Sequence, residues 1–281
     1  MNGIRAPIVV LGSGDIGSAV AHAACAAGAP VVLIDAADPP WPRRGMAFVD
    51  AWYVGATELD GVSACFCASI RSIPVVLDRA DRIAATTWSW QGVATALGPV
   101  ALVDARVPKR SAPAMLKDDP AATMLTIGLG PHYCAGVHVD VAVETAWGDD
   151  LGAVIERGET RPLAGEPRAL GGAGRERYVY APRSGRFRTS HAIGDRVAAG
   201  ETIAALDREP MAAPLSGVLR GLSANGARVA AGQKVIEVDP RGDPASCFGV
   251  GERPRRIAAG VMKALAQRAL VADPVAAAVA V

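Results

Sequence analysis

The expected fold is decided by the stretch Pro7-Ile8-Val9-Val10-Leu11-Gly12-Ser13-Gly14-Asp15-Ile16-Gly17. Its first five residues form a short, β-branched apolar run, which predicts a buried strand. The glycines follow at once, and residues 18–27 predict a helix of small side chains that ends at Gly28. Residues 30–34 are a second apolar run, so this part of the chain predicts a β–α–β unit.

The three glycines have the spacing of a dinucleotide-binding turn. In such a turn the first glycine permits the tight bend, the second lets the backbone approach a pyrophosphate, and the third lets the helix pack on the strand. Asp35 ends the second strand 18 residues beyond Gly17, where a carboxylate that accepts from a ribose hydroxyl belongs. The alternative is a structural turn without a ligand. The expected cofactor-binding residues here are Gly12, Ser13, Gly14, Asp15, Ile16, Gly17 and Asp35.

Alternating strand and helix patterns continue to about residue 158. Strands are predicted at residues 61–68, 74–77, 100–103 and 124–127, a helix at residues 87–97, and further short elements at residues 139–145 and 152–155. This alternation favours an α/β fold with a Rossmann-like, mostly parallel sheet over residues 1–158. Residues 159–176 are rich in Gly, Pro, Arg and Glu and are expected to form a linker.

An internal repeat marks the second half of the chain. Residues 181–185 and 194–200 recur at 213–217 and 226–232, both with an offset of 32 residues. Two such copies can bury a shared face. Residues 176–240 resemble the barrel-sandwich hybrid of lipoyl and biotinyl carrier domains, but the stretch that joins the copies, residues 206–211, has no modifiable Lys. We therefore expect no covalent biotin or lipoate. Residues 241–281 are expected to form a loop and a closing helix.

Other candidate site residues follow the later strands or lie in the loop after Asp35. A cofactor phosphate could be gripped by Arg43 and Arg44, whose alternative is a solvated surface pair. A second glycine turn holds a His and a Cys that could act as a base and a nucleophile, or be inert loop residues. Asp104 and Arg106 follow a predicted strand, and their alternative is an ion pair that supports the loop. These candidates are Arg43, Arg44, Asp104, Arg106, Gly128, Gly130, His132 and Cys134. The four His and five Cys have no zinc-site spacing, so no metal is predicted.

Composition excludes several classes. A net charge of +1 argues against a general nucleic-acid binder. No stretch approaches the ~20 apolar residues that cross a bilayer, and no secretory signal is visible. An odd number of irregularly spaced Cys is a poor disulfide framework. We expect a cytoplasmic protein, and the sequence leaves open its oligomeric state, with a homo-oligomer among the alternatives.

Several blocks together carry a resemblance to a known family. They are Gly12–Gly17, Arg43-Arg44 with Ala47-Phe48, Val103–Arg106, Ile127–Pro131, Ala135-Gly136, Glu144-Thr145, Asp239–Arg241 and Cys247-Phe248. In order and spacing they resemble the accessory protein family of selenium-dependent molybdenum hydroxylases. The resemblance implies a role in maturing or inserting a molybdenum pterin cofactor, with a hydroxylase as client and NAD or a molybdopterin-type nucleotide as ligand.

Three functions therefore stand as expectations. The first is a cofactor-maturation protein that binds a nucleotide or a molybdopterin-type ligand. The second is an NAD-dependent oxidoreductase that acts on a small metabolite, with His132 or Cys134 at the reacting centre. The third is a scaffold module without a ligand. The usual Tyr–Lys pair of short-chain dehydrogenases, a nucleophile elbow and a P-loop are all absent from the sequence, so whether the chain is an enzyme stays open.

Overall fold

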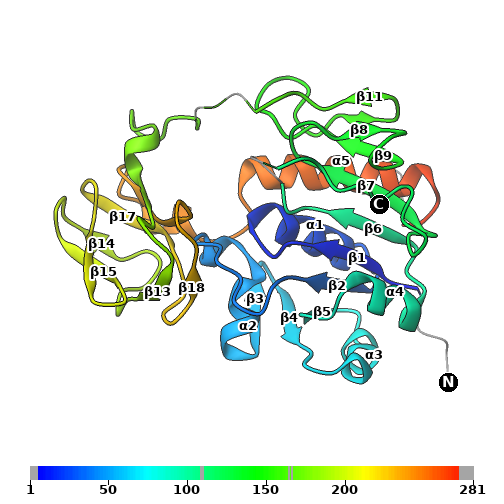
Figure 1. Cartoon of the computed structure of the whole chain (residues 1–281), viewed down its shortest axis with the longest axis horizontal. Helices are drawn as coiled ribbons and strands as arrows, with labels where there is room; N and C mark the ends of the chain where they lie inside the picture. The colour runs from blue at the N-terminus through cyan, green and yellow to red at the C-terminus, as the bar shows by residue number, and fades with distance from the viewer. Residues whose placement is uncertain (1–5, 108–110, 164, 166, 272–281) are drawn as a thin grey trace, which may run out of the picture.

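The computed structural model describes residues 6–107, 111–163, 165 and 167–271. The ends of the expected first and third domains, residues 1–5 and 272–281, lie outside this range, as do residues 108–110 and two residues of the expected linker. The described chain forms an α/β part and a smaller β-rich part, which lie on opposite sides of Figure 1. No helix among the described residues is long and apolar enough to span a bilayer.

The α/β part is built on a nine-stranded sheet with the order β10-β9-β7-β6-β1-β2-β5-β4-β3. Its central strands pair in parallel, whereas β3 with β4 and β9 with β10 pair antiparallel at the two edges. The strands are β1 (Ile8–Leu11), β2 (Val31–Ile34), β3 (Ala56–Leu59), β4 (Val62–Phe66), β5 (Arg82–Thr86), β6 (Ala101–Asp104), β7 (Leu125–Leu129), β9 (Val141–Val143) and β10 (Val154–Ile155). A separate pair, β8 (Cys134–Ala135) and β11 (Gly158–Glu159), lies beside it.

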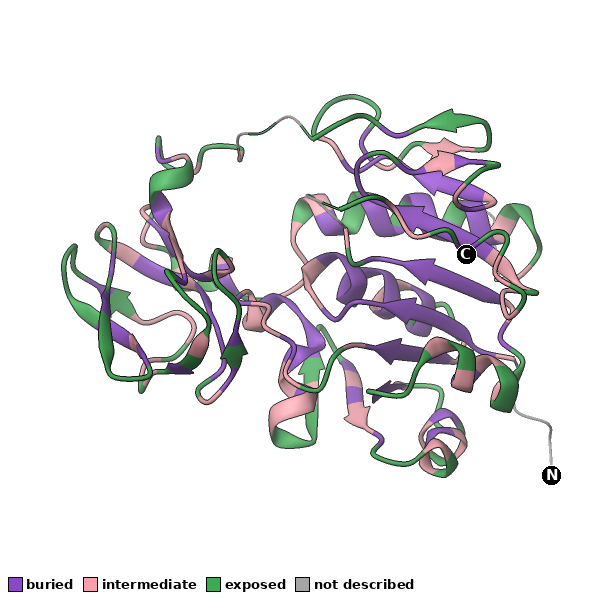
Figure 2. Ribbon diagram, in the orientation of Figure 1, coloured by how far each residue is buried: buried purple, intermediate pink, exposed green. Residues whose placement is uncertain are grey.

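Helices cover both faces of this sheet because its central strands are apolar on both sides (Figure 2). One core joins alternate strand residues such as Val10 to α1 (Asp15–Ala26) and α5 (Glu252–Gln267), which pack on each other. The other core joins the intervening residues, such as Val9, to α3 (Ile73–Leu77) and α4 (Trp90–Leu97). A short helix, α2 (Ala51–Val54), precedes β3.

The β-rich part confirms the repeat. Its strands are β12 (Tyr178–Tyr180), β13 (Gly185–Arg188), β14 (Arg196–Val197), β15 (Thr202–Leu206), β16 (Glu209–Ala212), β17 (Gly217–Leu222), β18 (Arg228–Val229) and β19 (Lys234–Asp239). They form two antiparallel sheets, β12-β19-β17-β14 and β16-β15-β13-β18. Each sheet takes two strands from each copy, so the copies bury one shared core between them. Equivalent turns also match: Gly194 and Gly226 have φ of 91° and 89°.

The expected fold class is corrected by this architecture. The large sheet is mixed, because a hairpin turns back at each edge, and the second half is a pair of antiparallel sheets. The structure supports an α/β unit with a large mixed sheet plus antiparallel sheets, in place of a Rossmann-like sheet followed by a lipoyl-type barrel-sandwich hybrid. The turn between β15 and β16 consists of Asp207 and Arg208, and the absence of covalent biotin or lipoate stays a prediction.

One predicted element is wrong. Residues 74–77 were expected to form a strand, but they belong to helix α3, where Pro74 occupies the first turn. Proline is tolerated at that position because its missing N–H would have no partner within the helix. The predicted closing helix is confirmed as α5, which returns to pack on α1 of the α/β part. The division into three domains stays a prediction.

Candidate functional site

The glycine turn after β1 has the backbone geometry that its sequence predicts. Gly12 has a φ of 96°, and a Cβ there would lie 3.1 Å from the Cα of Arg106. A Cβ on Gly17 would lie 1.8 Å from the carbonyl oxygen of Gly12, so only glycine lets α1 start this close to the turn. A Cβ on Gly14, however, would lie 3.3 Å from the indole ring of Trp41. An aromatic side chain of the same protein therefore occupies the space beside Gly14.

Asp35 holds this turn together from within the chain. Its Oδ2 accepts from the Ser13 amide and hydroxyl at 2.5 and 2.8 Å, and from Trp41 Nε1 at 2.7 Å. Its Oδ1 accepts from the Ala36 amide at 2.7 Å. The carboxylate that was expected to select a ribose is thus engaged by protein donors. Ile16 is buried in the core beneath the turn. Protein groups thus occupy both the space beside Gly14 and the acceptor atoms of Asp35, and the expected binding of NAD at these residues stays a prediction.

The two arginines of the following loop form internal ion pairs. Arg43 bridges Asp15, at 2.7 Å, and Glu237 of β19, at 2.9 and 3.0 Å. Burial by itself would raise the pKa of Asp15, but Arg43, with the charges of Lys234 and Arg253, lowers this pKa below its usual value. Arg44 pairs with Asp50 at 2.5 and 3.0 Å. Arg43 therefore ties the start of α1 to the β-rich part, and Arg44 braces its own loop.

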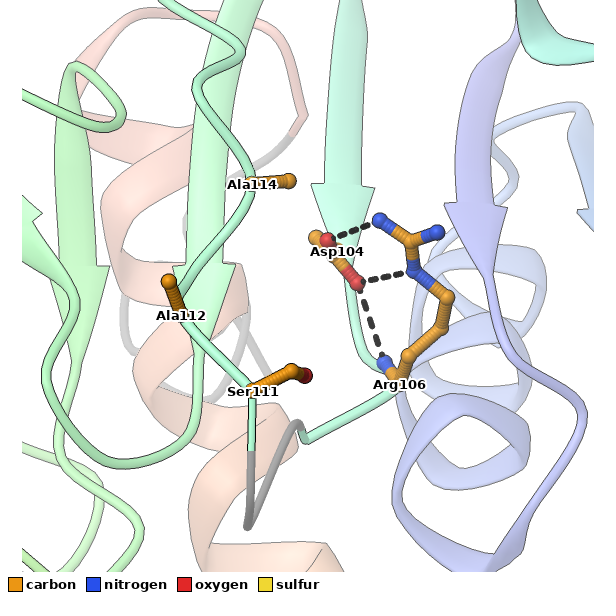
Figure 3. A pocket seen from close by; sticks show the side chains of 5 residues that line it. All are labelled: Asp104, Arg106, Ser111, Ala112 and Ala114. Carbon is orange, nitrogen blue, oxygen red and sulfur yellow. Dashed lines mark hydrogen bonds and ion pairs between the residues drawn. The ribbon is translucent and has the colours of Figure 1, made fainter.

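A cavity lies where the chain changes direction across the sheet. From β1 the chain proceeds to β2 on one side, whereas β6 lies on the other, and ligands of α/β proteins bind at such switch points. The cavity has a volume of about 390 Å³. Figure 3 shows that its lining comes from the end of β6 and the loop after it, through Asp104, Arg106, Ser111, Ala112 and Ala114.

Asp104 and Arg106 form a fixed pair at the edge of this cavity. The Nε and Nη2 atoms of Arg106 donate to the two oxygens of Asp104 at 2.9 and 2.5 Å, and its amide donates at 3.1 Å (Figure 3). The buried Tyr133 hydroxyl donates to Asp104 at 2.7 Å. Burial, with the adjacent Asp104 carboxylate, raises the pKa of Tyr133, so its hydroxyl remains a donor. Asp104 is 1% exposed, whereas half of the Arg106 side chain is exposed.

The second glycine turn makes room for the side chain of Tyr133. A Cβ on Gly128 would lie 2.2 Å from the Tyr133 ring, so this glycine makes room for the tyrosine. Gly130, with a φ of 129°, accepts from the Thr160 hydroxyl. His132 pairs with Glu159 at 2.8 Å.

The structure does not join His132 to Cys134. The Sγ of Cys134 lies 3.9 Å from the Ala135 carbonyl, and the imidazole that accepts from the Cys134 amide is that of His138. Across the described residues, no three or more His, Cys, Asp and Glu side chains are grouped so that they could hold a metal ion. The expected catalytic pair therefore stays a prediction without geometric support.

Sequence reasoning missed Trp41, Tyr133 and Glu237. Trp41 lies in a Pro-rich loop without periodicity, and Tyr133 stands next to the more conspicuous His132. Glu237 lies within a strand of the repeat, and the strand pattern gives it no special role. The signal that could have found it is the comparison of the two copies, because a charged residue at 237 corresponds to Ala205 at the offset of 32.

Comparison with known proteins gives one curated relative of interest. The chain is 32% identical over 267 residues to the "Uncharacterized protein YqeB" of Escherichia coli strain K12, covering 92% of this chain and 47% of that protein. The chain thus spans about half the length of the curated relative that it matches. No protein-family model matches the chain.

Distant similarity to solved structures is also found. A succinylglutamate desuccinylase/aspartoacylase of Rhodobacter sphaeroides is 20% identical over 53% of this chain and 60% of its own, with a TM-score of 0.21. The ectoine utilization protein EutE (DoeB) of Ruegeria pomeroyi, in its apo structure, is 11% identical over 83% of this chain and 86% of its own, with a TM-score of 0.24. Likeness at these TM-scores carries no argument about chemistry.

These findings correct the expected family. None of the proteins named above is described as a molybdenum hydroxylase or as its accessory, so the resemblance to that accessory family is not upheld. The maturation role is corrected with it, whereas a hydroxylase client stays an untested expectation. The alternatives of an NAD-dependent oxidoreductase and a ligand-free scaffold are likewise not supported by these comparisons.

Proposed function

We propose that the chain binds a small organic acid at the switch-point cavity, with Arg106 as the anchoring cation. The observation that carries this proposal is the fixed guanidinium of Arg106 beside a cavity of about 390 Å³. Cavities of this order suit small metabolites. A cytoplasmic location, as expected from the sequence, is part of the proposal.

Arg106 is prepared for a ligand before the ligand arrives. Asp104 fixes the guanidinium plane, Tyr133 fixes Asp104, and the backbone of Arg106 packs on Gly12. A side chain that is already ordered loses little entropy on binding, which favours affinity. The hydrogen bonds to Asp104 also raise the pKa of Arg106, so it stays charged at any physiological pH.

The donor inventory favours an acidic group on the ligand. A guanidinium carries five N–H donors, and among the described residues Arg106 uses only Nε and Nη2 toward Asp104. The remaining donors and the half-exposed surface suit a carboxylate or a phosphate monoester. Ser111 supplies a hydroxyl on the facing wall, and Ala112 and Ala114 supply an apolar surface for a short carbon chain.

The proposal predicts that an Arg106→Gln variant binds the ligand about ten-fold to a hundred-fold more weakly. This range corresponds to the ~1.5–3 kcal/mol of a hydrogen bond to a charged group. The measurement is a thermal-shift screen of short mono- and dicarboxylates and phosphate monoesters, followed by calorimetric titration of each compound that raises the Tm. Binding to the folded state alone raises the Tm with ligand concentration.

Arg183→Gln is the matched control. Arg183 is also half exposed and paired with an Asp, at 2.6 Å from Asp207, but it lies in the β-rich part. The control variant should bind as the unaltered protein does. The proposal fails if no acid of the panel stabilises the protein, or if Arg106→Gln and Arg183→Gln bind equally well.

A further inference from the structure

A second concentration of charge lies where the repeat meets the starts of two helices. Glu237 accepts from Arg43 and from the Nζ of Lys234 at 2.9 Å, and it lies 3.5 Å from Arg177 and 3.8 Å from Arg220. Glu237 is fully buried. One buried carboxylate is thus surrounded by four cationic side chains.

The starts of α1 and α5 meet at the same place. Asp15, in the first turn of α1, pairs with Arg43. The charges of Asp15 and Arg43 both act on Arg253, in the first turn of α5, whose Nε donates to the carbonyl oxygen of Thr145. The helix N-termini add partial positive charge at this point. We call the set Asp15, Arg43, Arg177, Arg220, Lys234, Glu237 and Arg253 the junction cluster.

Positive charge exceeds negative charge within the junction cluster. Five cationic side chains face the carboxylates of Asp15 and Glu237, and Glu144 adds a third negative charge that acts on Arg253. The neighbouring Asp239 is shared between Arg241, at 2.6 Å, and Arg220, at 3.4 Å, so it does not remove the excess. Burial, and after it the charge of Arg43, lowers the pKa of Arg220 below its usual value. Crowded cations of this kind are stabilised by an additional anion.

Part of the junction cluster is exposed to solvent. The side chains of Arg43, Asp15 and Lys234 are 24%, 23% and 26% exposed, so a small anion in solvent can contact all three. Lys234 Nζ also lies 4.4 Å above the centre of the Tyr178 ring, a cation–π contact that helps to order the ammonium group.

The repeat shows that the strand fold does not need these charges. At the offset of 32 residues, Lys234 corresponds to Thr202 and Glu237 to Ala205, in a strand with the same turns and pairing pattern. Lys234 and Glu237 therefore occur on β19, in the sheet that contacts the α/β part through Arg43. We propose that the junction cluster binds a divalent oxyanion, such as a phosphate group, between the two parts of the chain.

This site is separate from the proposed acid-binding cavity, and sulfate is the probe that tests it. Calorimetric titration with sodium sulfate, at an ionic strength held constant with sodium chloride, should show saturable binding to the whole chain. Lys234→Met should weaken this binding at least ten-fold, whereas Lys263→Met, on the exposed face of α5, should leave it unchanged. Both control and test remove one ammonium group, so their difference excludes a general salt effect.

Two further variants allow the sulfate titration to be interpreted. Arg253→Gln approaches the cluster from α5 and should also weaken sulfate binding, even if Lys234→Met fails to fold. Sulfate binding that is lost in Arg106→Gln but kept in Lys234→Met would assign the anion to the acid-binding cavity and would overturn the proposal. Absence of saturable sulfate binding, or equal loss in Lys263→Met and Lys234→Met, would overturn the proposal.

The pH dependence of sulfate binding gives an independent prediction. The pKa of Lys234 is lowered to about 8, with burial as the largest cause. The charge of Arg43 also lowers this pKa, whereas the charges of Glu237 and Asp15 raise it. The Tyr178 ring lies beside the ammonium group. Sulfate keeps its charge over this range, so its affinity should decline as the pH rises above about 8 and Lys234 loses its proton. Titrations at pH 7, 8 and 9 measure this, and an affinity that stays constant over the series contradicts the role of Lys234.

Discussion

Glu237→Gln is expected to lower the free energy of unfolding by about 3–5 kcal/mol, the loss typical of a buried ion pair deprived of one partner. Glutamine keeps the size of the side chain but removes the negative charge that all four surrounding cations face. Arg43 and Lys234 both lie 2.9 Å from the Glu237 carboxylate and would remain in the cluster without it. Urea unfolding followed by circular dichroism measures the difference.

A surface carboxylate provides the matched comparison for this variant. Glu209 pairs with Arg183 at 3.4 Å and is 58% exposed, so Glu209→Gln should change stability by less than about 1 kcal/mol. A double variant, Glu237→Gln with Lys234→Met, should recover part of the loss because it removes a cation together with its partner. Equal stability of Glu237→Gln and Glu209→Gln would contradict a central role for Glu237.

Acid should reduce the difference between the unaltered protein and Glu237→Gln. Burial alone would raise the pKa of Glu237, but Arg43 and Lys234 outweigh it and hold this pKa well below the usual 4.5. The unfolded state then binds the proton more readily, so the contribution of Glu237 is complete above pH 4.5 and is lost as the pH falls toward its depressed pKa. The two unfolding curves should therefore converge on acidification.

The start of the fold was accessible from the sequence because its determinants are local. β1, α1 and β2 follow an apolar run, a glycine turn and a second apolar run, and the structure confirms all three. The roles of Gly12 and Gly17 were also predicted, since close backbone packing depends on the absence of a side chain. The repeat offset likewise predicted which turns in the second half would be equivalent.

The sequence does not predict which group lies beside the glycine turn. The pattern indicates that a group can approach Gly14, but it does not say whether that group is a ligand or Trp41. Asp35 has the expected place at the end of β2, yet its oxygens are used by Ser13 and Trp41. A motif describes backbone geometry, whereas occupancy depends on side chains from loops without periodicity.

Contacts between distant segments explain why the Arg43–Glu237 pair and helix α3 were not predicted. Arg43 and Glu237 are separated by 194 residues, so no window of sequence contains both. Residues 74–77 show the opposite problem, because a β-branched run favours a strand locally while Pro74 and the packing of Ile73 and Leu77 against the sheet favour α3. Tertiary packing overrode local propensity there.

Gly17→Ala is expected to destabilise the chain by more than about 4 kcal/mol, at the extreme of single substitutions. Gly17 lies in α1, where alanine by itself would favour the helix by ~1 kcal/mol. The added methyl group would lie 1.8 Å from the carbonyl oxygen of Gly12 and 3.3 Å from the Cβ of Ala105. Backbone atoms cannot rotate away as a flexible side chain can, so α1 would have to move off β1.

Gly92→Ala separates this steric effect from helix propensity. Gly92 also lies in a helix, α4, but its added methyl group would approach only the Ser89 hydroxyl, at 3.2 Å, and the edge of Trp88, at 3.8 Å. This control should be neutral or slightly stabilising in guanidinium unfolding. A Gly17→Ala variant as stable as Gly92→Ala would mean that the turn can open. In that case Arg106, which packs on Gly12, would not be held at the edge of the cavity.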